Sequence, residues 1–188
     1  MSSLVIIVVA AIVLLGLGFF VWRFIAYRGQ RVIVCPETKQ PAGVELDAWL
    51  AVRGIDGDAV LRLKSCSRWP ERQDCDQDCL SQIEASPDGT LVRNIVTTWY
   101  RDRRCVYCSR VIGEIAWHDA MPALRAPDGS LAQWHSIATA EVPAILETHD
   151  AICWNCNLVE GFRREHPDLV TDRAETPLRE HAREHAIH

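Results

Sequence analysis

The sequence predicts an α+β protein in which one N-terminal transmembrane helix precedes a small domain of short strands, hairpins and helices. The first observation is an uncharged apolar run from Leu4 to Trp22. The second is a set of eight cysteines, all of which come after that run. The third is that short alternating and helical apolar patterns fill the rest of the 188-residue chain. This remainder is long enough for one ordinary domain or two small ones that share a core.

Residues 4–24 are expected to span the membrane, behind a short tip at 1–3. A helix from Leu4 to Trp22 is about 28 Å long, close to the roughly 30 Å hydrocarbon core of a bilayer. A single segment in lipid satisfies its backbone amides only as a helix. A cleaved signal peptide is the alternative, but no Lys or Arg precedes the run and no A-x-A-like site comes after it. We therefore expect an uncleaved anchor.

The charges beside this helix predict its orientation. Arg23, Arg28 and Arg31 lie at or just beyond its end, whereas only the α-amino group precedes it. The positive-inside rule then gives a single-pass protein of the cell (inner) membrane, with the N-terminus outside and the C-terminal domain in the cytoplasm. A reducing cytosol favours metal thiolates over structural disulfides. In the reverse orientation, the eight cysteines are read equally well as four disulfides.

The first half of the remaining chain, 25–90, is expected to be a β-rich module. Alternating apolar residues predict strands at 31–35, 44–50 and 59–64. The glycines at 54 and 57 indicate a turn over 54–58. Asp74 is a good N-cap for a helix from Cys75 to Ile83, which would place Cys75 and Cys79 on one helical face.

The second half, 91–170, is expected to form another module, with a polar tail after it at 171–188. Residues 91–99 form either a helix or an extended segment, because Val96, Thr97 and Thr98 leave both open. The other predicted elements are a strand at 111–117, a hairpin of 123–125 with 131–134 around the turn 126–130, a helix at 141–147, and a final helix at 157–166 that Pro167 ends.

The cysteines predict zinc as the cofactor, with about two ions per chain. Two C-x-x-C pairs supply one four-thiolate site, which consists of Cys105, Cys108, Cys153 and Cys156. The other four are the ligands of a second predicted site, namely Cys35, Cys66, Cys75 and Cys79. Only Cys75 and Cys79 have ligand-like spacing there. The alternatives are that a histidine replaces one of these ligands, or that Cys35 is simply buried in a strand.

The second half is expected to contain a zinc knuckle, which is the tight turn that carries the C-x-x-C pair Cys105 and Cys108, then a hairpin, and then a final helix whose first turn carries the second C-x-x-C. This order resembles the treble-clef arrangement of zinc fingers. The resemblance covers Cys105 to His166 and is one of layout. It implies a structural zinc site in the second module. Many knuckles of that type carry glycine just after the second cysteine, where this chain has Ser109 and Asn157.

Iron is the alternative metal, in a rubredoxin-like or Fe–S centre of a membrane-tethered electron-transfer protein. Fe–S sites normally have denser cysteine runs than this chain. Covalent haem would require C-x-x-C-H, but Asn157 comes directly after Cys156. A thioredoxin-type dithiol at Cys153 and Cys156 would require a βαβ context that the surrounding sequence does not show.

No other group of residues predicts chemistry, so we expect no catalytic residues and no enzyme. His118 with Asp119 fits a surface hairpin edge better than an acid–base pair, and His181, His185 and His188 fit a solvated tail better than a metal site. The net charge of −5 argues against nucleic-acid binding despite the short basic run 101–104. The sequence therefore predicts a membrane-anchored cytoplasmic zinc protein that acts as an interaction, assembly or scaffold factor with a protein partner.

Overall fold

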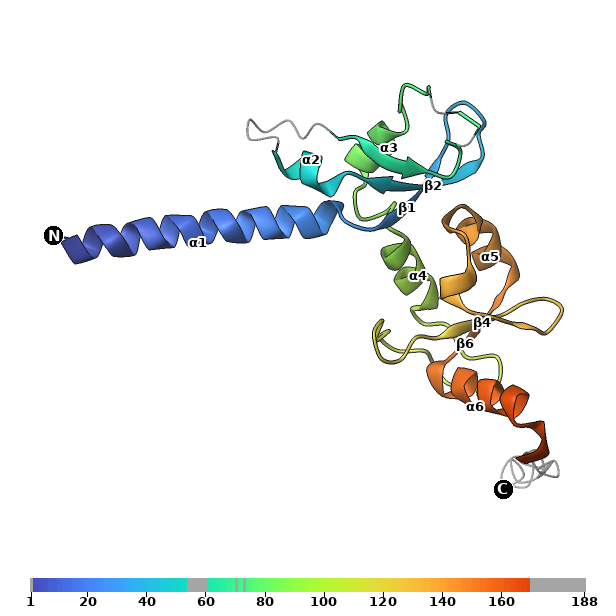
Figure 1. Ribbon diagram of the computed structural model, residues 1–188. Coiled ribbons are helices and arrows are strands. Elements are labelled where there is room, and N and C mark those ends of the chain that lie inside the picture. The colour runs from blue at the N-terminus through green and yellow to red at the C-terminus, as the bar shows by residue number, and fades with distance from the viewer. Residues whose placement is uncertain (1, 54–60, 70, 73, 170–188) are drawn as a thin grey trace, which may run out of the picture.

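The computed structural model describes residues 2–53, 61–69, 71–72 and 74–169 (Figure 1). It is a mixed structure of helices and short strands behind a long N-terminal helix. The strands form two antiparallel three-stranded sheets, of order β1-β2-β3 and β5-β4-β6. Two hydrophobic clusters accompany them, one drawn from residues 33–83 and one from residues 96–152. The predicted module boundary at 90/91 lies between these clusters and stays a prediction.

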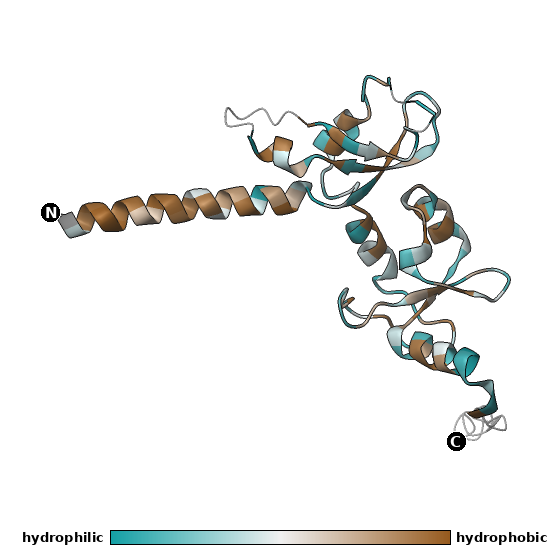
Figure 2. Cartoon of the chain, in the orientation of Figure 1, coloured by the Kyte–Doolittle hydropathy of each residue, from teal (hydrophilic) through white to brown (hydrophobic). Residues whose placement is uncertain are grey.

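Helix α1 (Ser2–Tyr27) is apolar along almost its whole length and stands away from the rest of the molecule (Figure 2). It contains the predicted span 4–24. Its side chains from residue 3 to residue 22 are exposed, and in the described part of the chain it is the one helix long and apolar enough to cross a membrane. Its last turn is hydrogen-bonded to the first strand, because the fully buried Arg31 donates from Nη2 to the Ala26 carbonyl oxygen at 2.7 Å. The same guanidinium donates from Nη1 to Thr90 Oγ1 at 3.0 Å.

The first sheet comprises β1 (Gln30–Val34), β2 (Pro41–Leu46) and β3 (Leu63–Cys66). Two short helices accompany it, α2 (Ala48–Arg53) and α3 (Leu80–Ala85). In β1 the buried residues alternate, as the period of a half-buried strand requires, whereas β2 also buries Gly43 between Ala42 and Val44. The buried core of this region consists of Ile33, Ala42, Val44, Leu46, Leu63, Cys79 and Ile83.

Two predictions for the first half are wrong. The strand expected at 44–50 stops at Leu46, because Asp47 Oδ1 accepts a hydrogen bond from the Leu50 amide at 3.0 Å and starts α2. The helix expected from Cys75 begins only at Leu80, since Gln77 has a left-handed backbone (φ 60°). Cys75 and Cys79 therefore do not share a helical face.

The strand expected at 59–64 is displaced toward the C-terminus. Described residues 61 and 62 are irregular, and β3 occupies Leu63–Cys66 instead. The first two residues of that predicted strand and the predicted turn at 54–58 lie outside the described residues. The displacement matters because it places Cys66 at the end of β3, opposite Val44 of β2.

The second sheet is built from β4 (Ala123–Arg125), β5 (Leu131–Ala132) and β6 (Asp150–Ile152). Its helices are α4 (Val92–Tyr100), α5 (Val142–Thr148) and α6 (Trp154–Glu165), with the single turns η1 (Trp134–Ser136), η2 (Thr139–Glu141) and η3 (Pro167–Leu169). Tyr100 is fully buried in the core, where its hydroxyl donates to the Ala123 carbonyl at 2.7 Å and accepts from Trp134 Nε1 at 3.2 Å.

Most predictions for the second half are confirmed. The hairpin of β4 and β5, the helix α5 with Pro143 in its first turn, and the final helix are present, although α6 starts at Trp154 and not at residue 157. The segment 91–99, which the sequence left open, is helical, with Leu91 as the N-cap residue of α4. The prediction of a strand at 111–117 is wrong, because that segment makes only isolated bridges at Val111 and Ala116. Strand β6 was not predicted.

The two halves touch through η2, which lies against β1 and β2 (Figure 1). Thr139 Oγ1 donates to Gln30 Oε1 at 2.7 Å. Thr139 also packs so closely on Gly43 that a Cβ at that glycine would meet it at 2.6 Å. The absence of a side chain at Gly43 is therefore what permits this contact.

Candidate metal centre

The structure brings the two C-x-x-C pairs together. One Sγ atom from each of the four cysteines lies within 4.8 Å of all the others. The sulfur atoms of Cys108 and Cys153, one from each pair, are 3.7 Å apart. We call this group the downstream cluster; it consists of Cys105, Cys108, Cys153 and Cys156. Such a group can hold a metal ion, and the convergence occurs across a gap of more than forty residues.

The first pair lies on a tight turn that its own backbone closes. The Cys105 amide donates to the Arg110 carbonyl at 2.9 Å, and the Ser109 amide donates back to the Cys105 carbonyl at 2.8 Å. Ser109 adopts φ 58°, a left-handed conformation that glycine adopts at lower cost. A third bond, from the Val106 amide to the Ala151 carbonyl at 3.0 Å, fixes the turn against β6.

The second pair is delivered by β6 and α6. Strand β6 pairs with β4, so the chain that leaves it passes beside the first pair. Cys153 is the N-cap residue of α6, and Cys156 lies in the first turn of that twelve-residue helix. The positive end of a helix dipole stabilises a nearby thiolate. The unpredicted strand β6 is thus the element that aligns the predicted ligands.

The four thiols influence one another's protonation. Burial opposes ionisation of Cys105, but backbone amides of Cys153, Cys108 and Tyr107 outweigh it and lower its pKa to about 6. Burial raises the pKa of Cys156, and hydrogen bonds with the other three sulfurs raise it further. One negative charge is therefore favoured and additional ones are opposed. A bound divalent cation reverses that opposition, because it stabilises coordinated thiolates in their ionised form.

The donor set indicates what the downstream cluster can do. Four thiolates complete a tetrahedral shell around zinc, which leaves no position for water or substrate. Cys105 is buried and Cys108 is exposed, so the cluster lies at the edge of the core. A donor set of four sulfurs is typical of structural metal sites.

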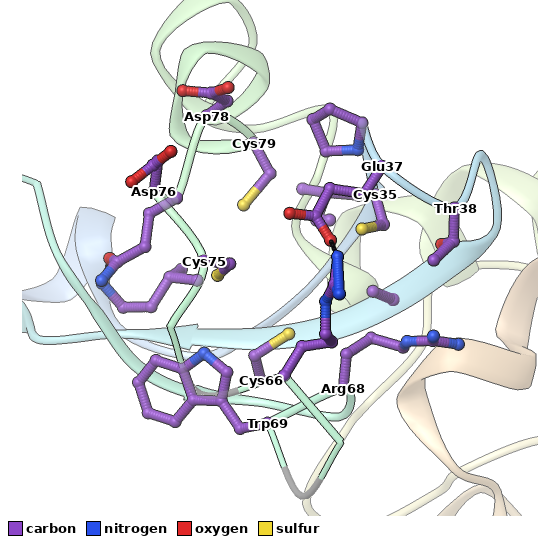
Figure 3. A pocket seen from close by; sticks show the side chains of 16 residues that line it. Cys35, Glu37, Thr38, Cys66, Arg68, Trp69, Cys75, Asp76, Asp78 and Cys79 are labelled. Carbon is purple, nitrogen blue, oxygen red and sulfur yellow. Dashed lines mark hydrogen bonds and ion pairs between the residues drawn. The ribbon is translucent and has the colours of Figure 1, made fainter.

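The other four cysteines surround one cavity in the first half of the molecule (Figure 3). We call this group the upstream cluster; it consists of Cys35, Cys66, Cys75 and Cys79. The cavity has a volume of about 60 Å³. Among the described residues, only the downstream cluster has all its sulfurs within 4.8 Å, so the upstream sulfurs are further apart. Burial, and after it the charges of the other three thiols, raises the pKa of Cys79 to about 11.

Two glutamines that the sequence did not single out position the upstream cysteines. Gln82 of α3 donates from Nε2 to the Val34 carbonyl at 2.7 Å and accepts from the Val34 amide at 3.0 Å, next to Cys35. Gln77 Oε1 accepts from the Leu63 amide at 2.9 Å, which holds the 75–79 segment against β3. No local motif marks these residues, because each pairs with a strand far away in the chain.

The histidines that lie within the described residues do not join either cluster. His118 and Asp119 are exposed on the turn that the Ala116–Ala120 bridge closes, as a surface position requires. His166 is the C-cap residue of α6, where its ring lies 4.8 Å from that of Phe162. The tail candidates His181, His185 and His188 lie outside the described residues.

Comparison of the chain with protein-family models, with curated proteins and with solved structures yields no significant match. Function must therefore be inferred from the clusters, the apolar helix and the surface.

Proposed function

We propose that this protein is a single-pass membrane-anchored, cytoplasmic zinc protein that serves as an interaction or assembly factor and not as an enzyme. The observation that carries the proposal is the downstream cluster, with four sulfurs within 4.8 Å of one another. An all-thiolate zinc shell is closed, so its role is to stabilise the fold that presents a surface. The knuckle, the β4–β5 hairpin and α6 support a treble-clef-like arrangement of the second module.

Contacts at the end of α1 support an anchor that is retained. Trp49 of α2 lies against the helix, with ring centroids 4.8 Å from Phe24 and 6.3 Å from Phe20. The Arg31 bond to the Ala26 carbonyl ties the last turn into the first sheet. A signal peptide that is cleaved off would not keep packing contacts and hydrogen bonds with the folded domain. Aromatic side chains at this end also suit the interface between lipid and water.

The orientation rests on the arginines that flank α1. Arg28 is exposed and Arg23 is half-buried, which leaves both able to meet lipid headgroups, whereas Arg31 is committed to the fold. Their position after the helix favours a cytoplasmic C-terminal part. Reduced thiols in that compartment are available for zinc.

The outward face of α6 supports a protein partner. Leu158, Val159 and Phe162 are each at least half exposed, at 59%, 50% and 50%. Trp154, one turn before Leu158, extends this apolar stripe toward the downstream cluster. Grouped exposed apolar residues are typical of interaction sites. We expect a partner that buries an apolar face of its own here, with the metal fixing the start of the helix.

Three measurements on the full-length protein test this proposal. A C-terminal reporter that is active only in the cytoplasm should be active. The protein purified in detergent should be colourless and contain zinc, and a red or brown preparation with thiolate-to-iron absorption would instead favour the electron carrier. In cross-linked cells, Phe162→Ser should remove a defined complex while Arg164→Ser, on the same helix, preserves it, with zinc content unchanged in both. Equal complexes in both variants would contradict the α6 surface.

A further inference from the structure

We propose that the upstream cluster is a second tetrahedral zinc site, in which Cys35 occupies a zinc-knuckle turn that lacks its second cysteine. The inference deepens the proposed function and rests on the cytoplasmic location given there. It starts from a backbone turn that recurs in the two halves of the chain.

The turn at Cys35 repeats the one at Cys105. The Cys35 amide donates to the Gln40 carbonyl at 2.9 Å, and the Lys39 amide donates back to the Cys35 carbonyl at 2.8 Å. At Cys105 the corresponding bonds span the same number of residues and measure 2.9 Å and 2.8 Å. Lys39 adopts φ 58°, as Ser109 does in the other turn. Two turns that share their bonds and their one left-handed residue present their first cysteine in the same way.

The two turns differ at the third residue after the first cysteine. Cys108 stands there in the downstream turn, and Thr38 stands there in the upstream one. Thr38 lines the same cavity as Cys35 (Figure 3). Position 38 is therefore directed at the place where a second knuckle ligand would lie.

Other elements supply the missing ligands from across the cavity. Cys66 enters at the end of β3, and Cys75 and Cys79 enter along the segment that leads into α3. The Gln82 and Gln77 bonds hold this segment against β1 and β3. Four cysteines from three separate stretches of chain thus line one small cavity, which is the arrangement a thiolate metal site needs.

The cavity also needs a cation if its thiols ionise. Arg68 and Arg72 line it, but Arg68 pairs with Glu71 at 3.1 Å and Arg72 pairs with Glu37 at 3.0 Å. Among the described lining residues, the basic side chains are therefore already matched by carboxylates. A divalent cation is the natural counter-charge for the cysteines, and zinc favours their sulfur donors.

The test uses the full-length protein in detergent, with zinc measured by elemental analysis and Co²⁺ as a spectroscopic substitute. We expect about two zinc ions per chain, and about one in Cys66→Ser. Adding Thr38→Cys to Cys66→Ser should restore the second ion, because the new thiol completes the C-x-x-C knuckle. The matched control adds Ser67→Cys to Cys66→Ser; Ser67 hydrogen-bonds to the Gly43 amide, does not line the described cavity, and should give no rescue.

The outcomes separate this inference from the function proposed above. If the protein contains one zinc that is lost in Cys153→Ser and unaffected by Cys66→Ser, the upstream site is overturned and the downstream centre is supported. If the protein contains one zinc that is lost in Cys66→Ser and unaffected by Cys153→Ser, the upstream site is supported and the downstream centre is overturned. Failure of Thr38→Cys to rescue, or equal rescue by Ser67→Cys, overturns the knuckle assignment. Upstream cysteines found oxidised in the freshly purified protein overturn the metal site.

Discussion

The two halves of this protein carry the same backbone turn with different side chains. Each turn is closed by the same two backbone hydrogen bonds and contains one residue with a left-handed backbone, which is Lys39 in the first turn and Ser109 in the second. The downstream turn also carries a second cysteine, whereas the upstream turn has Thr38 at that position. The comparison shows that this backbone turn forms without a C-x-x-C pair.

The halves also differ in how their remaining cysteines are held. Downstream, Cys153 and Cys156 belong to the start of the twelve-residue α6 and come directly after a paired strand. Upstream, Cys79 precedes a helix of only six residues, and Cys75 lies in irregular chain. The downstream cluster is consequently the more preorganised of the two, which agrees with the closer approach of its sulfurs.

The largest expected effect comes from removing a downstream ligand. Cys153→Ser should unfold the second half, because structural zinc contributes on the order of 10 kcal/mol and a domain has a net stability of about 5–15 kcal/mol. Thermal unfolding monitored by near-ultraviolet circular dichroism measures this. His118→Ala, at an exposed turn, is the control and should change the free energy of unfolding by less than about 0.5 kcal/mol. A folded Cys153→Ser protein that retains zinc would refute a stabilising role for the cluster.

The second prediction concerns the order of metal loss. In excess chelator, zinc should leave the upstream cluster about tenfold faster than the downstream one, a difference of about 1.4 kcal/mol in the barrier. The reason is that upstream ligands enter from irregular chain with fewer constraints. Stopped-flow detection with a chromogenic chelator should give two phases, and Cys66→Ser should abolish the fast one. Loss of the slow phase in that variant would reverse the assignment.

The third prediction tests the positioning role of Gln82. Gln82→Ala removes both bonds to Val34 and should lower the free energy of unfolding by about 1 kcal/mol. It should also accelerate the fast phase of zinc release and leave the slow phase unchanged. The matched variant is Gln133→Ala, which removes the 2.8 Å bond from Gln133 Nε2 to Asn157 Oδ1 in the other half. If both variants alter the same phase, the two clusters are not held independently.

The smallest expected effect concerns the left-handed residues of the turns. Ser109→Gly and Lys39→Gly should each stabilise the protein by about 0.5–1 kcal/mol, because glycine adopts positive φ without a Cβ penalty. Denaturant unfolding measures the shift. Glu114→Gly, in an exposed segment without positive φ, is the control and should not stabilise. Destabilisation by Ser109→Gly would show that its side chain matters more than its backbone.

The elements that local sequence predicted well are those whose stability is local. Helix α1 is explained by an uncharged apolar run, the β4–β5 hairpin by its turn residues, and α5 by Pro143 in its first turn. The helix expected from Cys75 failed for the opposite reason, because Gln77 accepts a hydrogen bond from the Leu63 amide, which the local pattern does not reveal. The strand expected at 44–50 failed because Asp47 caps a helix through the Leu50 amide, a local signal that competes with the alternating pattern.

The sequence by itself determined the apolar helix, the two C-x-x-C pairs and the assignment of eight cysteines to two groups of four. The helix and the two pairs depend on composition and short spacing, whereas the second group of four consists of the cysteines that remain once the two pairs are assigned. Only the tertiary structure decided that the downstream sulfurs meet, since this requires the pairing of β4 with the unpredicted β6. It also decided that Cys66 faces Cys35, Cys75 and Cys79, because three strands and two glutamine side chains must first pack before those cysteines share a cavity.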